Sequence, residues 1–98
     1  MLIHPETLKL TAAAGAVSGN SNPLMGICYN VLVKPATSTT TYDISITNGM
    51  NIIVFERTSE TGTLSEVTML PMNGIYTVAI SNATANELFT VQLVLRDN

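Results

Sequence analysis

Two side chains of this 98-residue chain have the chemistry of a nucleophile and a base, but the sequence does not bring them together. His4 is the only histidine and stands beside Pro5 near the N-terminus, where we expect an exposed imidazole without a catalytic role. Cys28 is the only cysteine, and a thiol needs a neighbouring base to become a nucleophile. We therefore expect Cys28 to act as a small buried hydrophobe. The sequence predicts no catalytic residue and no metal ligand.

The seven carboxylates are the other side chains with acid–base chemistry. Catalysis of that kind needs two groups close together, and nothing in their spacing requires such a pair. Most fall at expected strand ends or in loops, where solvation is their expected role: Glu6, Asp43, Glu56, Glu60, Glu66, Glu87 and Asp97. The sequence also lacks a phosphate-binding glycine loop, a nucleophile elbow, a zinc spacing and a calcium loop. We predict that the protein is not an enzyme and binds no cofactor.

The aromatic residues indicate a core rather than a sugar-binding platform. A platform that stacks sugars needs exposed rings, whereas these rings alternate with predicted core positions. They are Tyr29, Tyr42, Phe55, Tyr76 and Phe89. Two interpretations stay open for the methionines that flank the expected strands, because they either fill gaps in the core or form an adaptable contact surface. These are Met25, Met50, Met69 and Met72.

The composition predicts association with other proteins. Hydrophobic residues make up 46% of the chain and charged residues 11%, whereas an average soluble domain has about 25% charged residues. The net charge is −3 and the four cations are scattered, which argues against a nucleic-acid partner. No apolar run approaches the ~20 residues needed to cross a bilayer, so we expect no membrane partner. The N-terminus lacks the features of a secretory signal, and a single cysteine allows no intrachain disulfide, so we expect synthesis in a reducing cytoplasm.

Alternation of apolar and polar residues with a period of two predicts strands over most of the chain. The clearest strand is 41–47, and the Asn48-Gly49 pair after it predicts a type I′ turn into a return strand over 50–57. The segment 12–23 is rich in Gly and Asn and is expected to be a loop at the rim of a sheet, with a brief strand around Val17 as the alternative. The other predicted strands are 7–11, 26–34, 66–70, 75–81 and 88–96.

This spacing of about six or seven strands, with no convincing helix, predicts an all-β fold: an antiparallel β-sandwich of immunoglobulin-like or jelly-roll type. A small β-barrel is the alternative, and the strand order stays open. We expect one domain over residues 1–98, in which 1–6 form an extended N-terminal arm. In the central strand 26–34, alternation places Tyr29, Val31 and Val33 on an apolar face and Cys28 on the opposite, mixed face.

Five segments carry a resemblance to a known class of proteins: 8–11, 15–23, 26–33, 42–47 and 74–80. Their order resembles that in small all-β structural proteins of tailed bacteriophages, which are associated with the virion head. The resemblance implies a capsid decoration, or cement, protein that binds the outside of the head shell and stabilises it by bridging subunits. It also implies the major capsid protein as partner, a homotrimer, synthesis in the bacterial host cytoplasm, and a final location on the capsid surface of the virion.

Apolar residues near the expected loops and chain ends are the predicted protein–protein interface. They are Pro5, Leu8, Leu10, Pro23, Leu24, Met25, Met69, Leu70 and Met72. Two other functions stay open. A glycan or host-surface binding module of a phage tail or fibre would have exposed aromatic rings or a polar groove near residues 37–41 and 58–65. A small hydrolase would need two carboxylates about 5–10 Å apart in a cleft.

Overall fold

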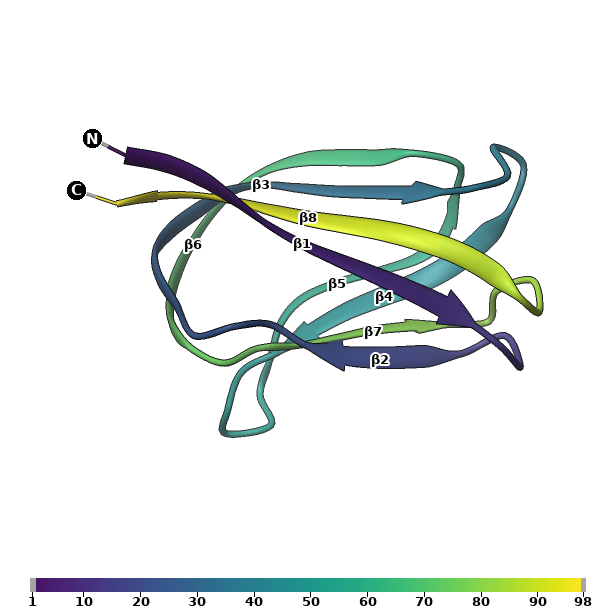
Figure 1. Cartoon of the computed structure of the whole chain (residues 1–98), viewed down its shortest axis with the longest axis horizontal. Helices are drawn as coiled ribbons and strands as arrows, with labels where there is room; N and C mark the ends of the chain where they lie inside the picture. Colours follow the sequence, from purple (N-terminus) through teal and green to yellow (C-terminus); the bar gives the residue numbers. More distant parts are fainter. Residues whose placement is uncertain (1, 98) are drawn as a thin grey trace.

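Eight β-strands in two antiparallel sheets make up the computed structural model, which describes residues 2–97 (Figure 1). The strands are β1 (Leu2–Ala12), β2 (Val17–Asn20), β3 (Leu24–Pro35), β4 (Thr41–Thr47), β5 (Ile53–Thr61), β6 (Leu64–Gly74), β7 (Thr77–Ser81) and β8 (Glu87–Asp97). One sheet has the order β1-β8-β3-β6 and the other the order β2-β7-β4-β5. The predicted all-β antiparallel sandwich is confirmed. No helix long and apolar enough to cross a membrane occurs among the described residues.

The strand order makes this sandwich a jelly roll. Antiparallel pairs join β1 to β8, β2 to β7, β3 to β6 and β4 to β5, as if one long hairpin were folded over across two sheets. Further pairs between β3 and β8 and between β4 and β7 complete the two sheets. This order decides between the two sandwich types that the sequence left open.

The strand β2 lies in segment 12–23, which was expected to be a loop with a brief strand around Val17 as the alternative. Gly19 and Asn20 have low strand propensity, which weakens the strand pattern in the sequence. In the structure β2 pairs with β7, and Gly19 lies against β1, where an added Cβ would come 2.7 Å from Leu10 Cδ2. The missing side chain thus lets β1 and β2 approach each other at one side of the sandwich.

The two edge strands of the β1-β8-β3-β6 sheet are longer than predicted, and each contains a proline. Residues 2–6, expected as an arm, are extended but pair with β8, and Pro5 lies opposite Val94. β6 continues through Pro71, which lies opposite Ile27 and was expected to end the strand. An edge strand pairs on one side only, so a residue without an N–H group can remain in it.

The core lies between the two sheets and takes alternate residues from the central strands. Its fully buried members include Cys28, Val31, Val33, Ile44, Ile46, Val78, Ile80, Phe89, Val91, Leu93 and Leu95. Tyr42 of β4 and Phe89 of β8 meet across the sheets, edge to face, with ring centroids 5.0 Å apart. The Tyr42 hydroxyl donates a hydrogen bond of 2.7 Å to the Gly62 carbonyl. This contact ties the core to the turn between β5 and β6.

A β-bulge in β3 reverses the faces that simple alternation predicts for the first half of this strand. Cys28 pairs with Leu95 and Asn30 with Val94, so Tyr29 is an extra residue relative to β8. Cys28 therefore points into the core with Val31, whereas Tyr29 lies on the outer face. The predicted placement of Tyr29 and Cys28 was wrong, because an inserted residue shifts the period by one.

The turn between β4 and β5 is not the predicted type I′ turn. Gly49 does not have the positive φ that such a turn requires, and the positive φ of 61° occurs at Asn51. Asn48 closes a longer loop: its Oδ1 accepts hydrogen bonds from the N–H groups of Met50 and Ile52, at 2.9 and 3.0 Å. β5 consequently begins at Ile53 rather than at residue 50.

A side chain at Gly62 should lower the stability of the fold for two reasons. Its φ is +70°, and an added Cβ would lie 2.7 Å from the Ser38 carbonyl oxygen. We expect Gly62→Ala to lower the free energy of unfolding by about 2 kcal/mol or more. The matched control is Gly49→Ala, whose Cβ would meet only the Ile75 oxygen at 3.9 Å. Urea unfolding should show the control within about 1 kcal/mol of the wild type, and equal losses would contradict the expectation.

Candidate binding surface

The two side chains first considered for nucleophilic chemistry have structural environments. Cys28 is fully buried, its Sγ lies 3.4 Å from the Asn30 carbonyl oxygen, and burial raises the pKa of its thiol. His4 belongs to β1 and is half-buried, with a buried Nε2 that has no hydrogen-bond partner among the described residues. The predicted exposure of His4 was therefore wrong, because residues 2–6 pair with β8. Within residues 3–96, no three His, Cys, Asp or Glu side chains lie close enough to hold a metal ion.

Several carboxylates tie segments of the fold together. Glu66 of β6 pairs with Arg57 of β5, where the two sheets meet. Glu87 is buried and accepts a hydrogen bond of 2.5 Å from the Thr37 N–H, and Glu6 accepts one of 2.7 Å from the Asn22 N–H. These contacts give structural roles to side chains that the sequence placed in solvent.

Four of the five aromatic residues lie in the core, as predicted: Tyr42, Phe55, Tyr76 and Phe89. Tyr29 is half-buried on the outer face of β3, and the Arg96 guanidinium lies over its ring, 5.8 Å from the centroid. A sugar stacked on Tyr29 would have to share the ring with this guanidinium.

The outer face of the β1-β8-β3-β6 sheet is mainly apolar at the end where the chain termini lie (Figure 1). Two adjacent rows of paired residues cross all four strands there. The first row is Ile3, Arg96, Ile27 and Pro71, and the second is Pro5, Val94, Asn30 and Val67. Met69 lies beside the second row, and Val67 and Met69 are 77% and 69% exposed. We call these two rows together with Met69 the outer patch. An exposed group of apolar side chains of this kind is a candidate interaction surface.

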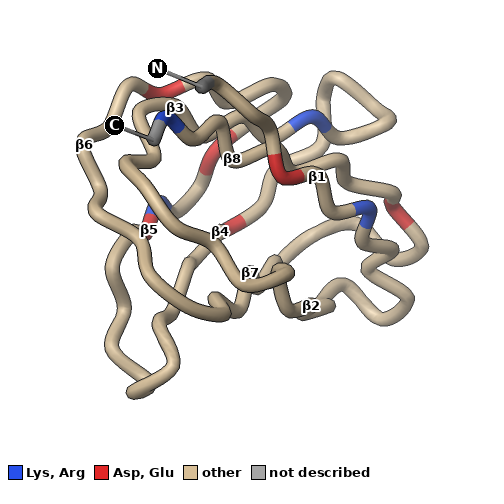
Figure 2. Tube along the Cα trace, turned by 60° about the vertical axis from the view of Figure 1, so that its left-hand side comes forward, with Lys and Arg blue, Asp and Glu red and all other residues tan. Residues whose placement is uncertain are grey.

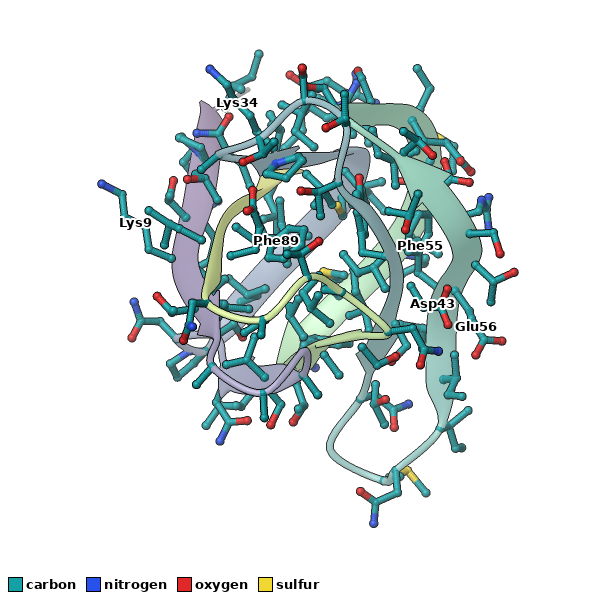
Figure 3. The ribbon with its side chains drawn as sticks, turned by 90° about the vertical axis from the view of Figure 1, so that its right-hand side faces the viewer. Lys9, Lys34, Asp43, Phe55, Glu56 and Phe89 are labelled. Carbon is teal, nitrogen blue, oxygen red and sulfur yellow. The ribbon has the colours of Figure 1, made fainter. Side chains whose placement is uncertain are left out.

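Two lysines and two carboxylates lie on opposite faces of the sandwich. Lys9 and Lys34 lie directly opposite Thr90 in adjacent strands of the same face as the outer patch, and Arg96 belongs to the patch itself. The β2-β7-β4-β5 sheet carries the carboxylates Asp43 and Glu56 among serine, threonine and asparagine residues. Figure 3 shows the two lysines on one side of the molecule and these two carboxylates on the other. The outer patch therefore suits a partner surface that is apolar and acidic.

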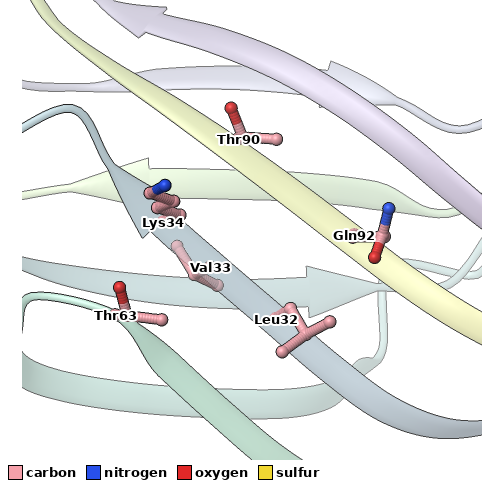
Figure 4. Close-up of a pocket in the computed structure, with 6 residues that line it drawn as sticks. All are labelled: Leu32, Val33, Lys34, Thr63, Thr90 and Gln92. Atoms are coloured by element: carbon pink, nitrogen blue, oxygen red, sulfur yellow. The ribbon is translucent and has the colours of Figure 1, made fainter.

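An open pocket of about 240 Å³ lies farther along the same face of β3 and β8 (Figure 4). Its lining is mainly apolar, and Lys34 stands at its side. The lining residues are Leu32, Val33, Lys34, Thr63, Thr90 and Gln92. Sites for drug-sized ligands have volumes of roughly 300–1,000 Å³, so this pocket has room for a single side chain rather than for such a molecule.

The structure divides the predicted interface residues between the surface and the core. Those at the surface are Pro5, Pro23, Met25 and Met69, which are exposed, and Leu70, which is half-buried. Leu8, Leu10, Leu24 and Met72 are buried in the core, because they occupy the inward positions of their strands and no partner can reach them. Pro5 and Met69 belong to the outer patch.

Sequence reasoning missed the patch residues Ile3, Val67 and Val94. Residue 3 was assigned to an arm, and Val67 was assigned to a short edge strand without a known face. The apolar residues on both sides of 88–95 were the available signal, because an outer strand face in solvent is usually polar.

No family model and no curated protein matches the chain. The chain is similar in structure to three solved proteins at low sequence identity. PliG, a periplasmic inhibitor of g-type lysozyme from Aeromonas hydrophila, has a TM-score of 0.47 and 10% identity, and the match covers 94% of this chain and 85% of that one. A family two carbohydrate esterase from Cellvibrio japonicus has a TM-score of 0.40 and 12% identity, with 97% of this chain and 35% of that one covered. The carbohydrate-binding module CBM36 has a TM-score of 0.38 and 11% identity, with 93% and 86% covered. At these values the likeness assigns the chain neither a family nor an activity.

Asp43 is expected to make the stability of the sandwich sensitive to acid. Its carboxylate accepts hydrogen bonds from the Ser59 N–H at 2.8 Å and from Asn82 Nδ2 at 2.7 Å, and these bonds lower its pKa. Since the folded state prefers the ionised form, its contribution to stability is present above the ordinary aspartate pKa of about 3.9 and is lost as the pH falls through the lowered value. We expect Asp43→Asn to flatten the loss of thermal stability between about pH 4 and pH 2. Glu56→Gln, which removes an exposed carboxylate from the same sheet, should leave the loss unchanged.

Proposed function

We propose that this protein is a virion structural protein of the capsid decoration, or cement, type, which binds the outside of a bacteriophage head shell through its outer patch. Its partner in this proposal is the major capsid protein, and its location is the capsid surface after synthesis in the bacterial cytoplasm. A trimer would let one decoration unit bridge several shell subunits.

The outer patch is the observation that carries this proposal. Its apolar rows occupy the outer face of a four-stranded sheet, which is about 19 Å wide at a strand spacing of 4.8 Å. A standard protein–protein interface takes about 800 Å² from each partner, which is about one seventh of the 5424 Å² that this chain exposes. A rigid sheet face also loses little conformational freedom on binding. The jelly-roll fold is compatible with the proposal, but it occurs in both viral capsid and lectin domains.

Glycan binding, the alternative from another class, has less support from the described residues. It requires exposed aromatic rings or a polar groove, whereas four aromatic residues are buried and Arg96 lies over the fifth. The pocket beside Thr63 is mainly apolar. A glycan array with specific hits that survive loss of the outer patch would favour this alternative.

Binding to purified shells tests the proposal. We expect the purified protein to cosediment saturably with expanded head shells of the source phage and to ignore shells of an unrelated phage. The protein should also be present in purified virions at a fixed ratio to the major capsid protein. Absence from the virion, or equal binding to both kinds of shell, would refute the proposal.

A further inference from the structure

A hairpin loop between β4 and β5 holds apolar side chains away from the rest of the sandwich. It projects from the end of the β2-β7-β4-β5 sheet (Figure 1). Met50 is 79% exposed, and Ile52 and Ile53 are each 53% exposed. We call these three residues the tip. Figure 2 shows no charged residue on this loop, and the nearest charged residues along the chain are carboxylates on both sides, Asp43 and Glu56.

The loop that carries the tip is ordered by its own hydrogen bonds. The Asn48 N–H donates to the Ile52 carbonyl at 2.9 Å, and the Asn51 N–H donates to the Asn48 carbonyl at 3.1 Å. The Asn48 side chain accepts the N–H groups of Met50 and Ile52 as described above. A loop that is already closed in this way loses little conformational entropy when it binds.

The pocket on the other sheet has the chemistry that the tip requires. An apolar cavity of about 150 Å³ is known to hold a benzene ring, and this pocket of about 240 Å³ has room for a methionine side chain. Its flank carries Lys34, and Lys9 lies across Thr90, so these cations would face Glu56, the carboxylate three residues after Ile53 of the tip. The tip lies at the end of one sheet and the pocket on the outer face of the other, so one molecule cannot join its own two sites.

We propose that the tip of one copy binds in the pocket of a second copy, with the Met50 side chain inserted beside Leu32. Each copy then gives one tip and offers one pocket, so the contact is head to tail. Such a contact closes into a ring when the rotation between copies allows it and otherwise continues as a filament. The biological use of this contact rests on the proposed function, in which a ring of three copies is the decoration unit, but the contact itself does not require a shell.

A membrane is the other surface that an apolar loop of this kind could enter. The charge beside the tip argues against it, because Glu56 would be repelled by anionic headgroups and the loop itself carries no cation.

Sedimentation velocity over a concentration series, in the absence of shells, tests the contact. The wild type is expected to associate. Met50→Glu should weaken association on the order of 30-fold, the loss typical of a hot-spot residue, and Leu32→Glu should do the same from the pocket side. Ser18→Glu is the control, since Ser18 is exposed on β2 and lies outside the tip, the pocket and the predicted interface; it should associate like the wild type.

Mixing the two impaired variants gives the sharpest result. Met50→Glu keeps a pocket and Leu32→Glu keeps a tip, so the mixture should form one-to-one dimers and nothing larger, while each variant alone stays monomeric. A monomeric wild type, association unaffected by Met50→Glu, or a mixture without dimers would overturn the proposal.

A vesicle experiment tests the membrane alternative. If the wild type is monomeric and binds phosphatidylcholine vesicles, and Met50→Glu loses this binding, the proposal is overturned in favour of a membrane. Shell binding is measured separately, so its failure would count against the cement function alone.

Discussion

Replacing Tyr42 by alanine is expected to lower the free energy of unfolding by about 3–5 kcal/mol, which is a large part of the 5–15 kcal/mol typical of a small domain. The ring is fully buried and packs edge to face on Phe89 of the opposite sheet. Its loss would leave a cavity between the sheets and an unpaired Gly62 carbonyl. Thermal unfolding should show a midpoint lower by about 12 °C or more. Thr41→Ala, an exposed neighbour in β4, should change the stability by less than about 0.5 kcal/mol.

Tyr42→Phe separates the hydroxyl group from the ring. Burial, and secondarily the nearby Glu60 carboxylate, raise the pKa of Tyr42 to about 12. Because the folded-state value lies above the ordinary value of about 10, the neutral phenol stabilises the fold below pH 10, and this contribution is lost as the pH rises towards 12. The variant should be less stable by about 1 kcal/mol at pH 8, and the gap should close at high pH. Urea midpoints at several pH values would measure this, and a constant gap would contradict the assigned cause.

Two carboxylates in the outer patch are expected to abolish most shell binding. In the double variant Val67→Asp with Met69→Asp, both substituted side chains are exposed in the free protein, so the fold should keep its stability within about 0.5 kcal/mol per site. At the interface, each carboxylate would be buried in an apolar contact without a partner. We expect affinity for expanded shells to fall on the order of 100-fold, which corresponds to about 2.8 kcal/mol.

The control places the same charges on the opposite sheet. Ser18 and Thr58 are exposed residues of β2 and β5, and Ser18→Asp with Thr58→Asp changes the net charge equally. Cosedimentation with shells should be unchanged for this variant. If both double variants bind equally well, the outer patch is not the docking surface; if both lose binding, net charge rather than the patch controls it.

The local pattern of the sequence determined most of the strands and the fold class. Alternation with a period of two requires only neighbouring residues, so β4 and β8 were predictable within one or two residues. The same pattern identified four core aromatics, and the dispersal of His4, Cys28 and the carboxylates carried the prediction that the protein is not an enzyme. The low fraction of charged residues was the basis for predicting that the chain associates with other proteins.

Features that depend on which strands become neighbours were decided by the tertiary structure alone. Strand order is set by contacts between distant segments, as between β1 and β8, and no local pattern encodes it. Pairing with β8 gave residues 2–6 a place in a sheet, and a single inserted residue at the bulge changed the faces of Tyr29 and Cys28.

The outer patch shows the same division. The sequence determined that apolar residues exceed what one core needs, and it predicted Pro5 and Met69 as contact residues. Only the register of four strands brought these two together with Ile3, Val67 and Val94, because side chains from opposite ends of the chain become neighbours when their strands pair. The apolar excess therefore came from sequence, and its place on one face came from strand pairing.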